Sequence, residues 1–363
     1  MKKIKIMSML FILIIMLSSC SSINKDALKD EIIVDEEEQS SDNPIAEGSV
    51  SDYFPFENDI RLVYSGTGND YADTNIYVDF IKEDRMQLRV IYSGNSSCVT
   101  YGQLVQVRGG EISFIKNVDN FYYRDNLTED DSNVFQIILK EPLQVGNSWI
   151  LSDGRKAFIS SIDKEIVTSL GSFNAIEVTT ENGDDCSYDY FVKDIGLVKM
   201  QYIYNGEKVT NELQKIVKDA FVEQTIKFYY PEYEKNRIVY KKNKISLKTN
   251  EEIKYVFEEY FKNPPTNDSS SLISLNTKIN SLYLDKDKLM VMVDFSSDFI
   301  KDMNLGSGYE AERLQAIGNT LGDYYNVDKV DITVDGKSYE SGHIIVDENN
   351  PITTNLEKTI EVK

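Results

Sequence analysis

Two different patterns of apolar and polar positions divide the chain. Over residues 53–220, short runs of alternating apolar side chains recur with turn residues between them, for example from Met86 to Tyr92 and from Phe173 to Thr179. Runs of this length at this spacing indicate the strands of an all-β domain. We therefore expect an N-terminal β-rich domain, built as a meander, a half-barrel or a sandwich, with no long amphipathic helix.

Over residues 221–347, strand periodicity alternates with helical periodicity. Apolar side chains follow a helical repeat in two stretches, formed by Ile253, Val256, Phe257, Tyr260 and Phe261, and then by Leu314, Ile317, Leu321 and Tyr324. Each stretch follows a capping-box pattern, Thr249–Glu252 in the first and Ser307–Glu310 in the second. Strand patterns flank both helices, so the order β-α-β-β-α-β predicts an α+β sandwich with two helices on one face of a mixed sheet.

Three shorter segments complete this division of the chain. Residues 205–224 fit either a short helix or a last strand, and we place the domain boundary near Ala220. The basic run Lys241–Lys244 is short and indicates a solvated turn. Residues 348–363 are expected to form a C-terminal tail.

The second domain resembles a known family, the GerMN domain of sporulation and spore germination in spore-forming Gram-positive bacteria. The residues that carry the resemblance are Gly306, Ser307, Glu310, Ile317, Asn319, Thr320, Leu321, Val327, Val330, Val334, Asp335 and Gly336. The resemblance covers residues 221–342, about a third of the chain. It implies a module that contacts other proteins of an envelope assembly. Better-known members carry two such domains in tandem, whereas this chain has one.

The N-terminus has the features of a bacterial lipoprotein signal. Residues 1–19 combine early lysines with an apolar run that is too short to span a bilayer comfortably. The run ends in small residues before Cys20, a pattern that resembles a lipobox and implies lipidation of the Cys20 thiol. An ordinary secretory signal with a chance cysteine is the alternative. We expect a lipid-anchored protein on the extracytoplasmic face of the cell membrane.

The segment between the anchor and the first domain is acidic and polar. Residues 20–52 include the run from Asp35 to Glu38, several serines and few large apolar side chains. Such a composition buries too little apolar surface to offset the entropy lost on ordering. We therefore expect this segment to be a disordered tether.

Charge excludes some classes of partner. The chain carries 60 acidic and 39 basic side chains, a formal net charge of −21 at pH 7. Phosphates would be repelled, so nucleic acid and peripheral binding to acidic lipid are not expected.

The cysteines and the single tryptophan lie in the β-rich domain or before it. Besides Cys20, the chain contains Cys98 and Cys186. A disulfide between them is allowed outside the membrane and would contribute about 4 kcal/mol in the chain-entropy model. The sequence leaves open whether their two strands are neighbours. Trp149 lies in a strand pattern and is expected to anchor the core.

Catalytic chemistry has little support in the sequence. His343 is the only histidine, which argues against zinc centres and Ser-His-Asp triads. A carboxylate pair could be drawn from Asp294 and Asp298, or from Glu310 and Glu312. In so acidic a chain such pairs are expected by chance. We therefore assign no catalytic residue, metal site or cofactor.

Together these features predict a non-enzymatic envelope lipoprotein whose GerMN-like domain contacts proteins of a sporulation or germination assembly. The alternative is a lipoprotein that binds a lipid, a glycan or a small molecule in the β-rich domain, beside Trp149. An enzyme that acts on the cell wall is a third hypothesis.

Overall fold

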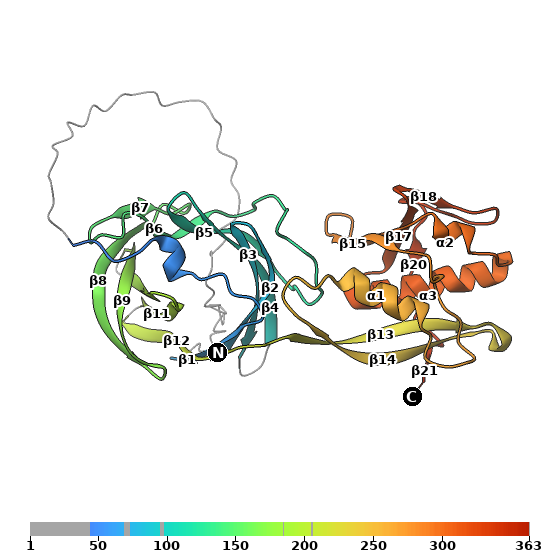
Figure 1. The fold of residues 1–363 in the computed structure, drawn as a ribbon, viewed down its shortest axis with the longest axis horizontal. Coiled ribbons are helices and arrows are strands. Elements are labelled where there is room, and N and C mark those ends of the chain that lie inside the picture. The colour runs from blue at the N-terminus through green and yellow to red at the C-terminus, as the bar shows by residue number, and fades with distance from the viewer. Residues whose placement is uncertain (1–43, 69–72, 95–97, 184, 205, 363) are drawn as a thin grey trace, which may run out of the picture.

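The computed structural model describes residues 44–68, 73–94, 98–183, 185–204 and 206–362. Two domains lie side by side along the long axis of the molecule (Figure 1). The first is all β, and the second combines strands with three helices.

The first domain is one antiparallel sheet of twelve strands. Its spatial order is β6-β5-β4-β3-β2-β1-β12-β11-β10-β9-β8-β7, so each strand pairs with its chain neighbour except where β1 meets β12. The strands are β1 Arg61–Thr67, β2 Asp73–Lys82, β3 Arg85–Ser93, β4 Cys98–Arg108, β5 Glu111–Val118, β6 Gln136–Lys140, β7 Ser148–Ile150, β8 Lys156–Thr168, β9 Gly171–Asn182, β10 Asp185–Val192, β11 Gly196–Tyr204 and β12 Glu207–Val217. The expected meander and half-barrel are confirmed, and the ambiguous stretch before Ala220 is strand β12.

The sheet curls until its two edge strands approach each other, as seen along its axis in Figure 1. The buried indole of Trp149 in β7 donates a hydrogen bond of 3.0 Å to the carbonyl of Ile137 in β6. Trp149 is thus part of the core, as expected, and links the two edges.

The short helix η1, Val50–Tyr53, contacts β5 and β11, with Val50 and Tyr53 buried in the same core. The backbone N–H of Ala46 also donates a hydrogen bond of 2.7 Å to the carbonyl of Leu143. The expectation that the disordered tether extends to residue 52 was therefore wrong for residues 44–52, because the side chains of Ala46 and Val50 pack against the barrel.

The second domain contains two sheets. The first has the order β13-β14-β21, and the second has the order β15-β16-β17-β18-β19 with β20 paired to β17. The elements are β13 Val222–Glu232, η2 Tyr233–Lys235, β14 Arg237–Leu247, α1 Ile253–Lys262, β15 Ile279–Asp285, β16 Met290–Phe295, α2 Asp298–Lys301, α3 Ser307–Tyr325, β17 Lys329–Val334, β18 Lys337–Glu340, β19 Ile345–Val346, β20 Ile352–Thr353 and β21 Ile360–Glu361. The tail after residue 347 therefore adds a strand to each sheet.

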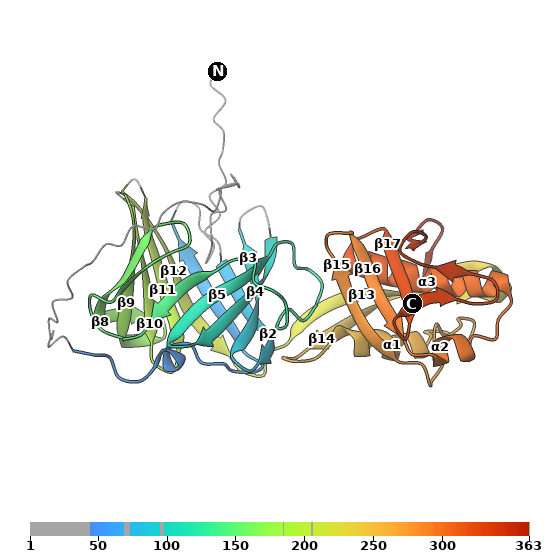
Figure 2. The same cartoon turned by 90° about the horizontal axis from the view of Figure 1, so that it is seen from above.

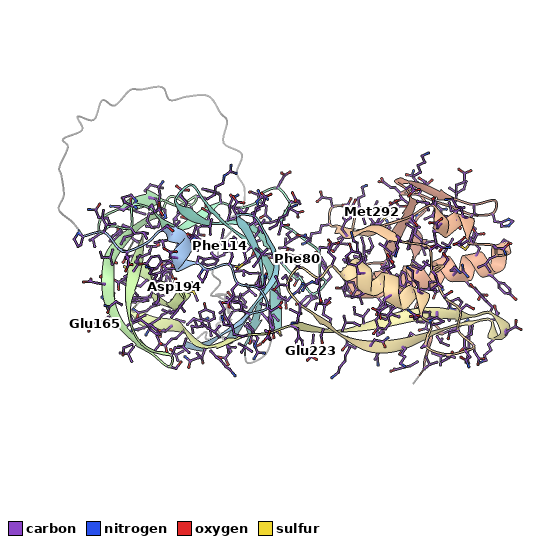
Figure 3. The ribbon with its side chains drawn as sticks, viewed as in Figure 1. Phe80, Phe114, Glu165, Asp194, Glu223 and Met292 are labelled. Carbon is purple, nitrogen blue, oxygen red and sulfur yellow. The ribbon has the colours of Figure 1, made fainter. Side chains whose placement is uncertain are left out.

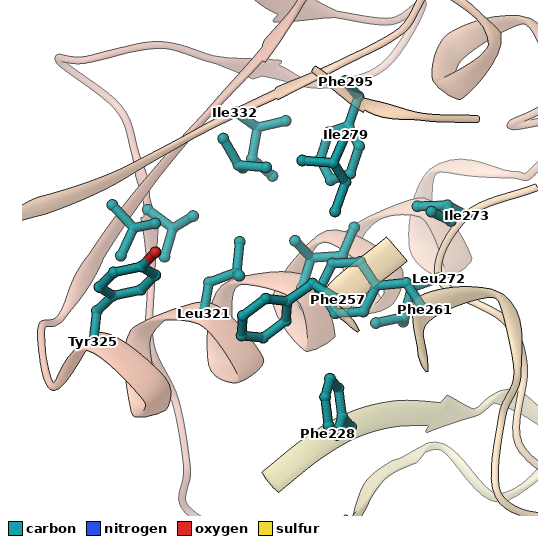
Figure 4. Packing of buried hydrophobic residues seen from close by; sticks show 14 of the residues in the cluster. Phe228, Phe257, Phe261, Leu272, Ile273, Ile279, Phe295, Leu321, Tyr325 and Ile332 are labelled. Carbon is teal, nitrogen blue, oxygen red and sulfur yellow. The ribbon is translucent and has the colours of Figure 1, made fainter. Parts of the chain in front are cut away.

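Helices α1 and α3 lie between these two sheets (Figure 1). Figure 4 shows Phe228 of β13 on one side of the helical residues Phe257 and Leu321, and Ile332 of β17 on the other. The expectation of helices on a single face of one sheet was wrong. The physical reason is that α3 buries the whole run from Ala316 to Gly322, so it needs cover on both sides.

The two expected capping boxes do not form. The first residue of α3 is Ser307 itself, and the buried Glu310 accepts a hydrogen bond of 2.8 Å from the hydroxyl of Tyr339. Thr249 donates to the carbonyl of Val78 in the first domain, at 2.9 Å, instead of capping α1. Long-range partners outcompete the local caps at both sites. The run from Lys241 to Lys244, expected as a turn, lies within β14.

Candidate functional site

The connection between β5 and β6 leaves the barrel and enters the second domain. Residues 119–135 form this connection, called the bridging loop below, and they extend toward the second domain in both views (Figures 1 and 2). Phe121, Tyr123 and Leu127 are buried in the hydrophobic core of the second domain, in the same cluster as Phe228. The two domains are therefore packed together through one shared core.

The barrel wall holds the bridging loop in place. In β4, Gly102 leaves space for the ring of Phe121, since a Cβ atom there would come within 2.8 Å of that ring. The buried guanidinium of Arg89 in β3 donates to the carbonyls of Phe121 and Tyr123, at 2.6 and 2.8 Å. Buried backbone carbonyls need such donors. The loop thus has a defined path across the outer face of the barrel.

Arg124 joins the two domains directly. Its guanidinium donates to the carboxylate of Asp79 in β2 at 3.0 Å, and to the carbonyls of Lys248 and Glu251, which precede α1, at 2.6 and 2.8 Å. Both charged side chains are fully buried, and a second cation, Arg89, lies 2.8 Å from the other Asp79 oxygen. This network fixes the start of α1 against the barrel.

The Arg124 guanidinium also stacks over an aromatic ring of the barrel. Its central carbon lies 4.8 Å from the ring centroid of Phe80, a geometry that favours a cation–π contact. Figure 3 shows Phe80 on the wall of the barrel that faces the second domain. Arg124 is therefore enclosed by both domains.

A cleft of about 630 Å³ lies beside this junction. It is formed by the end of β5, the bridging loop and the β15–β16 hairpin. Its lining includes Tyr123, Asp125, Tyr283 and Lys286. The ammonium of Lys286 lies 5.8 Å from the ring centroid of Tyr123. Its volume lies within the range of small-molecule sites, and its lining is mostly polar. Because the cleft also contains a buried hydroxyl, that of Tyr123, with no partner among the described residues, it is the candidate functional site.

Asp125 is the buried carboxyl group of the cleft. It accepts a hydrogen bond of 2.8 Å from the hydroxyl of Tyr325 and one of 3.0 Å from the backbone N–H of Leu284. Burial raises the pKa of Asp125 to about 6, since the charged form is poorly solvated there. Burial lowers the pKa of the Lys286 ammonium, while the charge of Asp125 raises it.

The cysteines singled out from the sequence are not brought together. Cys98 and Cys186 carry free thiols in this structure, the first exposed and the second half-buried. Five strands separate β4 from β10 in the order of the sheet, so the two cysteines are not on neighbouring strands and no disulfide joins them here. Cys20 lies outside the described residues.

The carboxylates considered as catalytic pairs have structural partners. Asp294 accepts hydrogen bonds from the hydroxyl of Thr333 and the backbone N–H of Gly336, at 2.6 and 2.7 Å. Asp298 forms an ion pair of 3.4 Å with Lys301 within α2. Neither arrangement brings the two carboxylates to a common site.

The remaining candidates from the sequence also lack a common site. They are Glu310, Glu312 and His343. Glu310 is bound to Tyr339, as described above, whereas burial raises the pKa of Glu312. His343 is exposed beside the last strands. Within the residues that the structure describes, no group of three or more His, Cys, Asp or Glu side chains could hold a metal ion.

The residues of the junction were missed in the sequence because their partners are distant along the chain. Arg124 contacts Asp79, 45 positions earlier, and Lys248, 124 positions later. A usable signal was present in one strand, where Asp79 interrupts the otherwise apolar run from Tyr77 to Ile81. Buried charges of this kind require a charged partner.

The part of the chain that the structure describes contains no helix long and apolar enough to cross a membrane.

Comparison with known proteins identifies the second domain. Residues 227–340 match the family model described as "Germane: Sporulation and spore germination". This stretch is a GerMN domain, as its sequence suggested. No match was found among curated proteins.

Three solved structures are similar to parts of the chain. The tandem GerMN domains of the sporulation protein GerM from Bacillus subtilis match with 16% identity over 37% of this chain and a TM-score of 0.27. This chain covers 46% of that protein. The first GerMN domain of GerM matches with 18% identity over 36% of this chain and 97% of the other, with a TM-score of 0.28. A protein with a YmcC-like fold from Bacteroides fragilis matches with 11% identity over 46% of this chain and 98% of the other, with a TM-score of 0.32.

Proposed function

From the GerMN domain that residues 227–340 form, we propose that this chain is a sporulation-associated envelope protein that acts by binding other proteins. It is anchored to the extracytoplasmic face of the cell membrane through lipid on Cys20. The family match is the single observation that carries this proposal.

The organisation of the chain supports an anchored module. Residues 1–19 have the pattern of a lipoprotein signal, and the acidic segment 20–43 has the composition of an extended spacer. The buried Arg124 junction then joins the barrel and the GerMN domain, so the spacer would present them together at a distance from the membrane. A rigid two-domain body of this kind suits a scaffold role.

The GerMN domain offers accessible positions at which contact with a protein partner can be tested. Leu275 is 80% exposed and precedes β15, and Ile345 of β19 is 52% exposed. Single exposed apolar side chains do not by themselves mark a contact site, so these two residues serve here as accessible positions from which a bound partner can be detected. We propose that the GerMN surface, and not the barrel, makes the essential contact.

Site-specific photo-crosslinking in sporulating cells tests this proposal. A crosslinking amino acid is placed at Leu275, at Ile345 and, as a control on the barrel, at Val167, which is 73% exposed in β8. The proposal predicts that the two GerMN positions capture the same envelope protein and that Val167 captures none. Capture from Val167 alone would assign the contact to the barrel. Capture of no envelope protein at any position would refute the interaction role.

A further inference from the structure

The cleft beside the bridging loop contains polar groups that the protein leaves unpaired. The Tyr123 hydroxyl is buried and has no hydrogen-bond partner among the described residues, although its side chain lines the cleft. The Lys286 side chain is exposed and interacts with its neighbours through longer-range charge and the ring of Tyr123. Most buried polar groups in folded proteins have partners, so the Tyr123 hydroxyl marks this cleft as a ligand site, with Lys286 as a solvent-accessible cation beside it.

The charges of the cleft restrict the class of ligand. Its lining contains two lysines and four aspartates, Lys116, Lys286, Asp119, Asp125, Asp130 and Asp287. Lys116 already forms an ion pair of 3.2 Å with Asp130. The remaining charge is negative on balance, in a chain whose net charge is −21. An anionic ligand is therefore disfavoured.

The placement of Asp125 and Lys286 favours hydroxyl groups. Their charges influence each other, but the two side chains form no direct ion pair in this structure. A hydroxyl between them can donate its proton to the carboxylate and accept a hydrogen bond from the ammonium. The Tyr123 hydroxyl supplies a further donor and acceptor nearby, and the half-exposed ring of Tyr283 offers an apolar surface for C–H groups.

We propose that this cleft binds a neutral saccharide unit, with sugar hydroxyls between Lys286 and Asp125 and another on the Tyr123 hydroxyl. The volume of about 630 Å³ lies within the usual range for small-ligand sites. Because the site is formed by both domains, the ligand would also bind across the junction that Arg124 fixes. This inference does not depend on a role in sporulation.

Binding of defined saccharides to the full chain tests the proposal. The probes are chitobiose and maltose, which are neutral, and digalacturonate, which is anionic. Saturation-transfer NMR is measured at about 10 mM probe, where a site with a millimolar Kd is filled. The proposal predicts transfer to at least one neutral probe and weaker or absent transfer to digalacturonate.

Two variants remove the unpaired groups with little structural cost. Tyr123→Phe keeps the ring and deletes only the hydroxyl, and Lys286→Gln removes the ammonium. Each is expected to weaken binding of the neutral probe by about tenfold, equivalent to about 1.4 kcal/mol. The matched control is Lys288→Gln on the same hairpin, because Lys288 is paired with Glu348 at 2.6 Å and does not line the cleft. Its binding should equal that of the wild type.

Three results would overturn the proposal. The first is no transfer to either neutral probe, and the second is preferential binding of digalacturonate. The third is unchanged binding in both cleft variants, or an equal loss in Lys288→Gln. Circular dichroism of all three variants confirms that they are folded before binding is compared.

Discussion

The Arg124 junction makes a quantitative prediction about how the two domains unfold. Arg124→Met keeps most of the side-chain volume but removes the guanidinium. The carbonyls of Lys248 and Glu251 and one Asp79 oxygen then lose a donor in a buried position. Removing one partner of a buried ion pair typically costs about 3–5 kcal/mol. Because Arg89 still pairs with Asp79, we expect the lower end of that range, about 3 kcal/mol.

Urea unfolding followed by circular dichroism measures this loss. The hydrophobic cluster around Phe228 includes Phe121 and Tyr123 of the bridging loop, so the wild type is expected to unfold in one cooperative transition. The control is Arg108→Met on the barrel. The Arg108 side chain is 78% exposed, and its ion pair with Asp84 is long, at 3.9 Å. This control should change stability by less than about 0.5 kcal/mol. A loss for Arg124→Met no larger than that of the control would refute the proposed role of the junction.

Three further predictions concern single groups. Gly102→Ala places a Cβ atom against the Phe121 ring and should cost about 1–3 kcal/mol by overpacking, measured in the same urea assay; an unchanged midpoint would contradict this. Because burial raises the pKa of Asp125 to about 6, the folded chain binds this proton more tightly than the unfolded chain. The stability of the wild type relative to Asp125→Asn should therefore increase by about 2–3 kcal/mol as the pH falls from 7 to 4, and a pH-independent difference would exclude the assignment. The exposed thiol of Cys98 should react with a thiol reagent faster than the half-buried thiol of Cys186, and a protein without reactive thiols at either position would show that they are bonded.

Local patterns in the sequence were enough to predict the elements of both domains. Alternating runs such as Met86 to Tyr92 correspond to strands of the barrel, and the helical repeat from Ile253 to Phe261 corresponds to α1. These patterns depend on which residues of an element face the hydrophobic core, and such residues recur every second position in a strand and every third or fourth in a helix. The resemblance of the second domain to the GerMN family likewise depended on residues within one continuous stretch.

The contacts between distant segments could not be predicted in this way. The sequence assigned Phe121 and Tyr123 to the barrel domain, although they complete the core of the other domain. Thr249 and Glu310 fitted local capping boxes, but each has a partner elsewhere in the fold, Val78 and Tyr339 respectively. A capping pattern is recognised only from residues a few positions apart in the sequence. It cannot show that a more distant group competes for the same side chain.

The candidate site could not be predicted from the sequence for the same reason, because its residues come from distant segments. Tyr123 and Asp125 come from the bridging loop, whereas Lys286 comes from the β15–β16 hairpin about 160 positions later. Neither segment has a motif that indicates a site. Only the packing of the two domains brings them to one cleft.

The most direct test of the proposed function is the count of heat-resistant spores in the native host. Three strains are compared: the parent, a strain without this chain, and a strain in which Cys20→Ala replaces the wild type. The account predicts a fall of several orders of magnitude in the deletion strain, shared by the Cys20→Ala strain, because the protein must be anchored at the membrane to act. Unchanged counts with normal germination in the deletion strain would contradict the sporulation role.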